Sequence, residues 1–422
     1  MAPSETKFKV AAVHASPIFM NKSATLAKVI SLIEQAASEQ VRFLAFPETF
    51  VPGYPYFIEC YPPITQAPAL ARYAEESVVV SSDLAAVAQA CKEKNVGISL
   101  GVSERMEGGY TLFNSQVMMD SDGEIVSVHR KLQPTYVERM VWAQGGGATL
   151  DVKPLAAVGG FNVGGLACWE NTMNGARQAL IAQNQHIHIA AWPALSTLSG
   201  FESTADAQIE ALAKTHALTA QVFVLVASNY VDQTCLDWMA ANLGPQSFVK
   251  PGGGWSSIIH PFCSLLAAPV EGGKSGDVLV KAEIDLSDLK TVKVWIDSNG
   301  HYARPEVVQF SLDKTPLWGD EKRGEGWWRK EGSTSANRVR VGNGGKEEGG
   351  ERGGGDGSFR TGGKRVTTPK WWIPQNTNNI IRSNAHHYPN YTPQNNAKKK
   401  ENKKIGGITV SSVPISNYAL CL

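Results

Sequence analysis

Close cysteine pairs are missing from this chain, although it contains several cysteines. The six cysteines among its 422 residues are Cys60, Cys91, Cys168, Cys235, Cys263 and Cys421. No two of them have the CxxC spacing, which argues against a zinc knuckle and against a disulfide scaffold. We therefore expect reduced thiols, as in an intracellular protein.

Long apolar runs are also missing from the sequence. The opening stretch MAPSETKFKV has no apolar core of signal-peptide length. No stretch reaches the roughly 18 apolar residues that a membrane-spanning helix needs. These absences predict a soluble, cytoplasmic protein without a membrane partner.

Net charge is small overall but unevenly distributed. The total is +1, yet residues 1–320 contain 22 Lys and Arg against 31 Asp and Glu, which gives −9. Residues 321–422 contain 18 basic against 8 acidic residues, which gives +10. The acidic part gives no reason to expect a nucleic-acid partner. For the basic end, three hypotheses stay open: it binds polyanions, it contributes to an assembly, or it is foreign sequence.

Strand and helix patterns alternate over the first 300 or so residues. Short apolar runs indicate buried strands at 8–15, 41–46, 96–103, 161–168, 186–192 and 222–228, and three further strands follow residue 254. Helices are predicted after a cap at Asn21 or Ser23, and over 81–95, 176–184 and 204–218. The segment DSDG (120–123) joins two strands into a hairpin. This pattern predicts an α/β fold of two mixed sheets with a helical layer on each outer side.

The character of the sequence changes after Trp318. A Gly-rich charged stretch, GNGGKEEGGERGGGDGSFRTGG, is followed by an Asn-rich stretch that ends in a lysine cluster. Such segments bury too little apolar surface to offset the entropy of ordering. We predict one domain over 1–320 and a basic tail over 321–422 that is mostly disordered.

Three residue types suited to nucleophilic catalysis stand at the ends of predicted strands. Cys168 ends the strand FNVGGLAC, Glu48 follows VRFLAF, and Lys131 follows EIVSVHR. A carboxylate near a thiol can accept its proton, and a buried ammonium can stabilise an anion formed when the thiol adds to C≡N or C=O. Glu138, seven residues after Lys131, could orient that lysine.

Each of these residues also has a structural interpretation. Cys168 could be a buried filler residue, Glu48 an exposed loop acid and Lys131 an ordinary surface lysine. Glu138 could form a salt bridge with Arg139 or Arg130. It is the joint occurrence at three strand ends that favours a catalytic site.

Three segments in this order resemble the signature segments of the nitrilase branch of the carbon–nitrogen hydrolase superfamily. They are FPETFVPGYPYF, HRKLQPTYVERMVW and GGLACWEN, and SNGHYARPEVVQFSL (298–312) resembles the typical C-terminal segment of that branch. The resemblance covers residues from about 8 to 318. It implies a four-layer α-β-β-α sandwich and a Glu-Lys-Cys triad, here Glu48, Lys131 and Cys168.

The resemblance also carries expectations about the rest of the site and about assembly. Glu138 matches the second glutamate of the family's site, and the backbone N–H of Trp169 matches an oxyanion donor. The implied reaction converts an organic nitrile to the carboxylic acid and ammonia through a thioimidate, with no metal or organic cofactor. Dimers are implied through helices at about 174–184 and 204–220, and such dimers often extend into helical filaments.

Aromatic residues near the predicted site suggest a substrate pocket. Tyr54, Trp169 and Trp192 would form its walls if their strand ends converge, although Trp192 could be core packing and Tyr54 a turn residue against Pro55. His186 and His188 share a strand face, as metal ligands can. No third ligand is apparent in the sequence, so we interpret them as a surface or interface pair.

Three alternatives to a nitrilase stay open at this stage. An amidase or a cyanide hydratase or dihydratase of the same superfamily would use the same triad. A structural filament protein that has lost activity belongs to another class, and the intact triad residues argue against it.

Overall fold

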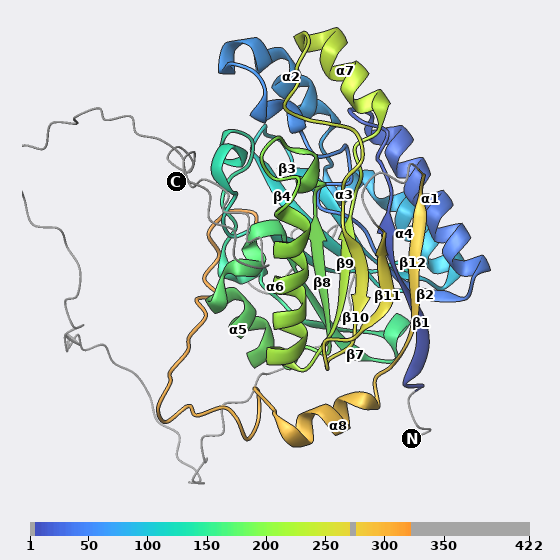
Figure 1. Ribbon diagram of the computed structural model, residues 1–422, viewed down its shortest axis with the longest axis vertical. Coiled ribbons are helices and arrows are strands. Elements are labelled where there is room, and N and C mark those ends of the chain that lie inside the picture. Colours follow the sequence, from blue (N-terminus) through green and yellow to red (C-terminus); the bar gives the residue numbers. More distant parts are fainter. Residues whose placement is uncertain (1–4, 271–275, 322–422) are drawn as a thin grey trace, which may run out of the picture. The chain divides into compact units, whose positions relative to one another are not determined.

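The chain folds into two stacked β-sheets, each covered on its outer side by helices (Figure 1). The computed structural model describes residues 5–270 and 276–321, all of which belong to one compact unit, Met1–Arg338. The four-layer α-β-β-α sandwich of two mixed sheets is thus confirmed. The predicted disordered tail lies outside the described residues.

The first sheet contains the N-terminal strands. In spatial order its strands are β12 (Val278–Asp285), β1 (Lys7–His14), β2 (Val41–Ala45), β3 (Gly97–Arg105), β4 (Leu112–Met119) and β5 (Ile125–Arg130). Strands β1, β2 and β3 are parallel, while β12, β4 and β5 pair antiparallel to their neighbours. The β4–β5 pair is the predicted hairpin.

Helices α1 (Lys22–Ser38), α3 (Val80–Asp83) and α4 (Ala85–Lys94) belong with this first sheet. Apolar side chains of α1 and α4 pack against its outer face in one buried cluster. Asn21 caps α1, since its side chain accepts a hydrogen bond from the Ala24 N–H at 3.0 Å. The single helix predicted over 81–95 is instead divided at Leu84, whose φ and ψ leave the helical region.

The second sheet repeats the arrangement with later segments. In spatial order its strands are β11 (Leu265–Val270), β10 (Ser256–Ile259), β9 (Phe223–Ser228), β8 (Ile187–Trp192), β7 (Phe161–Ala167) and β6 (Lys153–Leu155). Strands β7, β8 and β9 are parallel. Helices α5 (Asn174–Ala182) and α6 (Ala205–Ala220) cover its outer face, and the two sheets bury a shared apolar cluster between them.

Three helices and several single turns were not predicted. Helices α2 (Pro63–Glu76) and α7 (Gln233–Leu243) pack on each other at one end of the sandwich (Figure 1), and α8 (Asp288–Trp295) follows β12. Helix α2 contains Pro68, which masks its helical pattern. Single turns of 3₁₀ helix are η1 (Tyr56–Glu59), η2 (Tyr136–Met140), η3 (Gly147–Thr149), η4 (Ala156–Val158), η5 (Cys168–Thr172) and η6 (Leu195–Thr197).

No helix in the described part of the chain has the length and apolar character needed to cross a membrane.

The topology brings three strand ends to one edge of the sandwich. Strand β5 runs in the direction of β2, because two successive antiparallel pairings, β3 with β4 and β4 with β5, restore the direction. Strand β7 of the second sheet ends at the same edge. Cys168, which follows β7, lies close to Glu48, which follows β2, and Glu48 in turn contacts Lys131, which follows β5. The residues that follow β2, β5 and β7 can therefore meet.

Candidate active site

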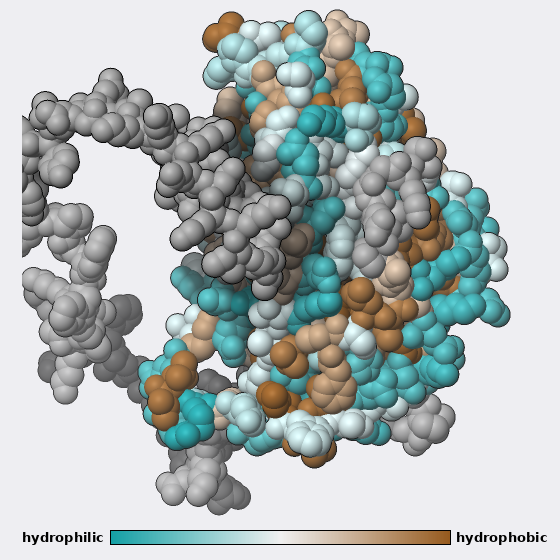
Figure 2. All heavy atoms as spheres, in the orientation of Figure 1, coloured by the Kyte–Doolittle hydropathy of each residue, from teal (hydrophilic) through white to brown (hydrophobic). Residues whose placement is uncertain are grey.

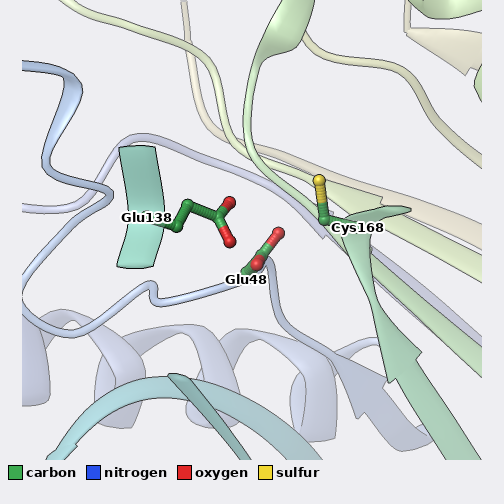
Figure 3. Close-up of side chains that lie close together, drawn as sticks. All are labelled: Glu48, Glu138 and Cys168. Carbon is green, nitrogen blue, oxygen red and sulfur yellow. The ribbon is translucent and has the colours of Figure 1, made fainter. Parts of the chain in front are cut away.

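Glu48, Lys131, Glu138 and Cys168 meet at this edge. A carboxylate oxygen of Glu48, one of Glu138 and the Cys168 sulfur all lie within 4.8 Å of one another (Figure 3). The Nζ of Lys131 lies 2.8 Å from Glu48 Oε1 and 2.7 Å from Glu138 Oε2. The four residues predicted as catalytic thus form one buried cluster, although 120 residues separate the first from the last.

Glu48 is buried rather than exposed, which contradicts its interpretation as a loop acid. Its Oε1 accepts hydrogen bonds from Lys131 and from the Asn114 side chain, the latter at 2.6 Å. Its Oε2 has no hydrogen-bond partner among the described residues. Burial raises the pKa of Glu48 to about 7; the Lys131 charge opposes this rise and the Glu138 charge adds to it. Near neutral pH the group can therefore both accept and return a proton.

Lys131 is equally buried, so it is not a surface lysine. Its backbone is bound on both sides: its N–H donates to the Asn114 carbonyl at 2.8 Å, and its carbonyl accepts from the Gly145 N–H at 2.9 Å. Burial alone would lower its pKa, but the charges of Glu138 and Glu48 raise it well above the ordinary value. Lys131 is thus held as an ammonium ion between two carboxylates.

Glu138 is fixed in place by the turn that carries it. Its Oε2 accepts from the Thr135 backbone N–H at 2.8 Å and from Lys131, and its Oε1 accepts from the Tyr54 hydroxyl at 3.0 Å. Thr135 and Glu138 form a capping box at the start of η2. Its ion-pair partner is therefore Lys131, not Arg139 or Arg130.

Cys168 occupies a strained backbone position directly after β7. Its φ is +52°, a left-handed conformation that costs a non-glycine residue on the order of 1–3 kcal/mol. Glu170 stabilises this turn, since it accepts from the Ala167 N–H at 3.0 Å and the Leu132 N–H at 2.8 Å, and pairs with His129 at 3.0 Å. The strained turn places the thiol sulfur within 4.8 Å of a carboxylate oxygen of Glu48 and of Glu138.

The Cys168 thiol is protonated in the resting site. Burial and the charge of Glu48 raise its pKa well above the ordinary value, while Lys131 and the Trp169 backbone N–H act in the opposite direction. Removing its proton therefore requires a base in contact, and Glu48 is the group placed to accept it.

Tyr54, Trp169 and Trp192 are the residues predicted to form the walls of a substrate pocket, and that role stays a prediction. All three pack in the apolar cluster that contains Cys168. The rings of Trp169 and Trp192 lie 5.9 Å apart edge to face, and the Tyr54 ring lies 5.9 Å from that of Trp142. Tyr54 is more than a turn residue, because its hydroxyl binds Glu138.

The two histidines singled out in the sequence do not belong to this site. His188 is fully buried, with Asn171 and Gln185 as hydrogen-bond partners at 2.9 and 3.1 Å, so a surface position is wrong for it. His186 accepts from the Asn162 N–H at 3.0 Å. Both rings thus have protein partners.

Glu48, Glu138 and Cys168 together have the donor types of a metal site. The Lys131 ammonium already lies between the two carboxylates. A metal cation at that position would be repelled by it.

Three residues of the site were missed from the sequence: Asn114, His129 and Glu170. Asn114 and His129 occur on strands β4 and β5, where a polar residue within an apolar run was the available signal. Glu170 follows Cys168 by two residues. Its fully buried carboxylate, which binds two backbone N–H groups, could be seen only in three dimensions.

Comparison with known proteins gives consistent matches. The family model described as "Carbon-nitrogen hydrolase" matches residues 9–294. A nitrilase from Pseudomonas syringae pv. syringae is 35% identical over 312 residues, 73% of this chain and 90% of that protein. An aliphatic nitrilase from Rhodococcus rhodochrous is 34% identical over 313 residues, 73% of this chain and 83% of that protein.

Among solved structures, two matches bear on the fold alone because their sequence identity is low. Saccharomyces cerevisiae Nit3, a member of branch 10 of the nitrilase superfamily, aligns with a TM-score of 0.54 at 16% identity, covering 71% of this chain and 97% of that chain. A carbon–nitrogen hydrolase from Helicobacter pylori aligns with a TM-score of 0.53 at 20% identity, covering 72% of this chain and 99% of that chain.

Proposed function

The chain belongs to the carbon–nitrogen hydrolase family, in its nitrilase branch, and from this premise we propose that it hydrolyses an organic nitrile to the carboxylic acid and ammonia. As a member of that family it is a hydrolase that acts on carbon–nitrogen bonds. The observation that carries the proposal is the contact between Glu48, Lys131 and Cys168 in one buried site.

The first chemical step is addition of sulfur to the nitrile carbon. Glu48 takes the proton of Cys168, the thiolate adds to the C≡N carbon, and the nitrogen takes the proton to give a thioimidate. The negative charge that develops on nitrogen is stabilised by Lys131 and by the Trp169 backbone N–H. One such donor is typically worth roughly 3–4 kcal/mol in the transition state.

Two water molecules complete the reaction. The first, deprotonated by Glu48, adds to the thioimidate carbon, and the nitrogen leaves as ammonia once it has received protons, leaving an acyl-cysteine. The second cleaves the thioester to release the carboxylic acid and the Cys168 thiol. Glu138 holds Lys131 at the place where the charge develops, with support from Tyr54.

The nucleophile is tested by Cys168→Ala. We expect this variant to release no ammonia from any nitrile, because the proposed thioimidate forms on the Cys168 sulfur, while its thermal unfolding matches that of the wild type. Cys263→Ala is the matched control and should keep full activity, since this cysteine lies at the β10–β11 turn. Wild-type turnover by Cys168→Ala would refute the proposal.

A substrate panel separates the proposed activity from its alternatives. Aliphatic, aromatic and arylaceto-nitriles, the corresponding amides and cyanide are each scored for acid, amide and ammonia. We expect acid and ammonia from nitriles. Formamide from cyanide would favour a cyanide hydratase, and hydrolysis of amides alone would favour an amidase. If no substrate is turned over and an electrophile does not label Cys168, the result would favour an inactive structural protein.

We further propose that the chain assembles into dimers through α5 and α6, which extend into larger helical particles. Leu218 on α6 is 44% exposed, and Met173, which precedes α5, is 36% exposed. The projecting segment drawn in orange in Figure 1 carries some brown, hydrophobic residues in Figure 2. Exposed aromatic and aliphatic side chains from α8 onward include Trp295, Tyr302 and Val308. Sedimentation velocity should show particles larger than one chain, and Leu218→Glu should reduce their size.

A further inference from the structure

Arg130, the residue before Lys131, is completely buried and has no role in the proposed reaction. Neighbouring residues of an extended segment point in opposite directions. Lys131 accordingly contacts Glu48 and Glu138, whereas the Arg130 guanidinium contacts a separate set of acidic residues. The residues that bind the Arg130 side chain therefore also fix the position of the adjacent Lys131 backbone.

Two of the carboxylates that bind Arg130 come from the end of the described chain. Asp320 accepts two hydrogen bonds from the guanidinium, at 3.0 and 2.7 Å, and Glu321 accepts one at 3.3 Å. Glu104 on β3 accepts from the Arg130 Nε at 3.1 Å. The Phe113 ring lies against the guanidinium, 3.8 Å from its central carbon to the ring centroid. A charge buried this fully is held in one position by such partners.

The same end of the chain lies against the loop of residues 144–147, in which the Gly145 N–H binds the Lys131 carbonyl. We call residues 312–321 the C-terminal strap. A Cβ added to Gly146 would lie 2.9 Å from the Leu317 side chain, and one added to Gly147 would lie 2.1 Å from the Asp313 carbonyl oxygen.

A side-chain hydrogen bond also joins the strap to this loop. The Trp318 indole N–H donates to the Gln144 carbonyl at 2.8 Å, and the next residue, Gly145, donates its N–H to Lys131. The Trp318 ring also packs edge to face on Phe113, at 5.0 Å between centroids. The strap thus supports Lys131 from two directions, through Arg130 and through this loop.

We propose that the C-terminal strap positions Lys131 for catalysis, with Asp320 and Glu321 as positioning residues that act through Arg130. This inference rests on the proposed function, because it takes Lys131 as the catalytic cation. It connects the active site to the point at which the chain continues beyond residue 321. A displacement of about 1 Å in a reacting or stabilising group can cost on the order of 100-fold in rate.

The test uses the full chain with its carboxylates neutralised. In Asp320→Asn/Glu321→Gln we expect kcat to fall about 10-fold or more while KM stays within about twofold, since Lys131 contributes in the transition state. Asp313→Asn is the matched control. Its carboxylate belongs to the strap but binds Thr315 rather than Arg130, accepting from the Thr315 N–H at 2.8 Å, and kcat should not change.

A pH profile separates positioning from a loss of folded protein. The titratable groups nearest to Glu48 are Lys131, Glu138 and Cys168, and the buried hydroxyls of Tyr54, Tyr56 and Tyr73 also interact with it electrostatically. Moving the Lys131 charge away from Glu48 raises the pKa of Glu48, so the acidic limb of the kcat/KM profile should move to higher pH in the double variant. In the control the limb should stay in place.

Two outcomes would overturn the inference. One is wild-type kcat and an unchanged acidic limb in the double variant; the other is a lower kcat with an unchanged limb and a lower Tm, which describes a stability role only. If the double variant does not fold, Asp320→Asn alone carries the same test, because the Asp320 side chain is 25% exposed. Absence of turnover in the wild type would refute the proposed function instead, before the strap is tested.

Discussion

At the residue scale, the charges of Glu48, Lys131 and Glu138 determine which groups of the site carry a proton. Two buried carboxylates share one ammonium ion, and a protonated thiol lies beside them. Because the dielectric response inside a protein is weak, each of these charges shifts the protonation of the others. The protonation of Glu48 is therefore a property of the whole cluster.

Removing one charge should shift the pH dependence in a known direction. The Glu138 charge raises the pKa of Glu48, so Glu138→Gln should lower that pKa and keep Glu48 ionised at lower pH. The acidic limb of the kcat/KM profile should then lie at lower pH than in the wild type. We expect kcat to fall roughly 10- to 100-fold because Lys131 loses a charged partner.

The exposed Glu107 provides the control for this variant, since its carboxylate accepts from the Ser81 hydroxyl at 2.9 Å, away from the buried cluster. Glu107→Gln should leave the whole profile unchanged. A limb that stays in place or moves upward in Glu138→Gln would contradict the charge coupling described here.

At the scale of elements, close backbone contact fixes the loop that presents Glu48. Strand β3 passes directly beneath this loop at Gly101. A Cβ at Gly101 would lie 2.1 Å from the Pro47 carbonyl oxygen and 2.9 Å from the Glu48 Cα. Only glycine permits this approach, so the strand and the catalytic loop are built as one unit.

Gly101→Ala should displace Glu48 from Lys131 and Cys168. We expect a loss of about 1–3 kcal/mol in the free energy of unfolding, as for other overpacked sites, and a fall in kcat of about 100-fold. Urea unfolding and ammonia release measure the two effects. Gly109→Ala, outside the site and outside the proposed interface, is the control: a Cβ there would lie no closer than 3.9 Å to its nearest neighbour, and the free energy of unfolding and kcat should stay unchanged.

At the scale of the whole molecule, the sandwich and the strap together hold the site, and the basic tail follows them in sequence. We expect a chain that ends at residue 330 to keep kcat within about twofold, because it retains residues 312–321. A chain that ends at residue 311 should lose most of its activity, since Arg130 loses Asp320 and Glu321. Ammonia release and light scattering on both chains measure activity and particle size.

Equal loss of activity in the two shortened chains would assign a role to the tail itself. Equal retention would show that the strap is dispensable. The domain boundary that we predict near residue 320 falls within the strap, and Glu321 is still buried.

The periodicity of apolar residues predicted the two sheets and the helices that cover them, and the order of the motifs predicted the site. Helices α2, α7 and α8 were not predicted. The alternation of apolar runs and amphipathic helices predicted both sheets and their helical layers, because burial of one face imposes a repeat on the sequence. Helix α2 was missed because Pro68 interrupts its pattern, and the division of the 81–95 helix at Leu84 has no signal in composition.

The sequence by itself determined which chemical groups stand at the strand ends, because residue type and strand boundaries are local properties. Only the tertiary structure decided that Glu48 and Cys168 meet across two different sheets, that Asn114 and Glu170 support them, and that residues 312–321 return to Arg130. The physical reason is that burial and Coulomb interaction depend on distance in space. No spacing along the chain encodes that distance.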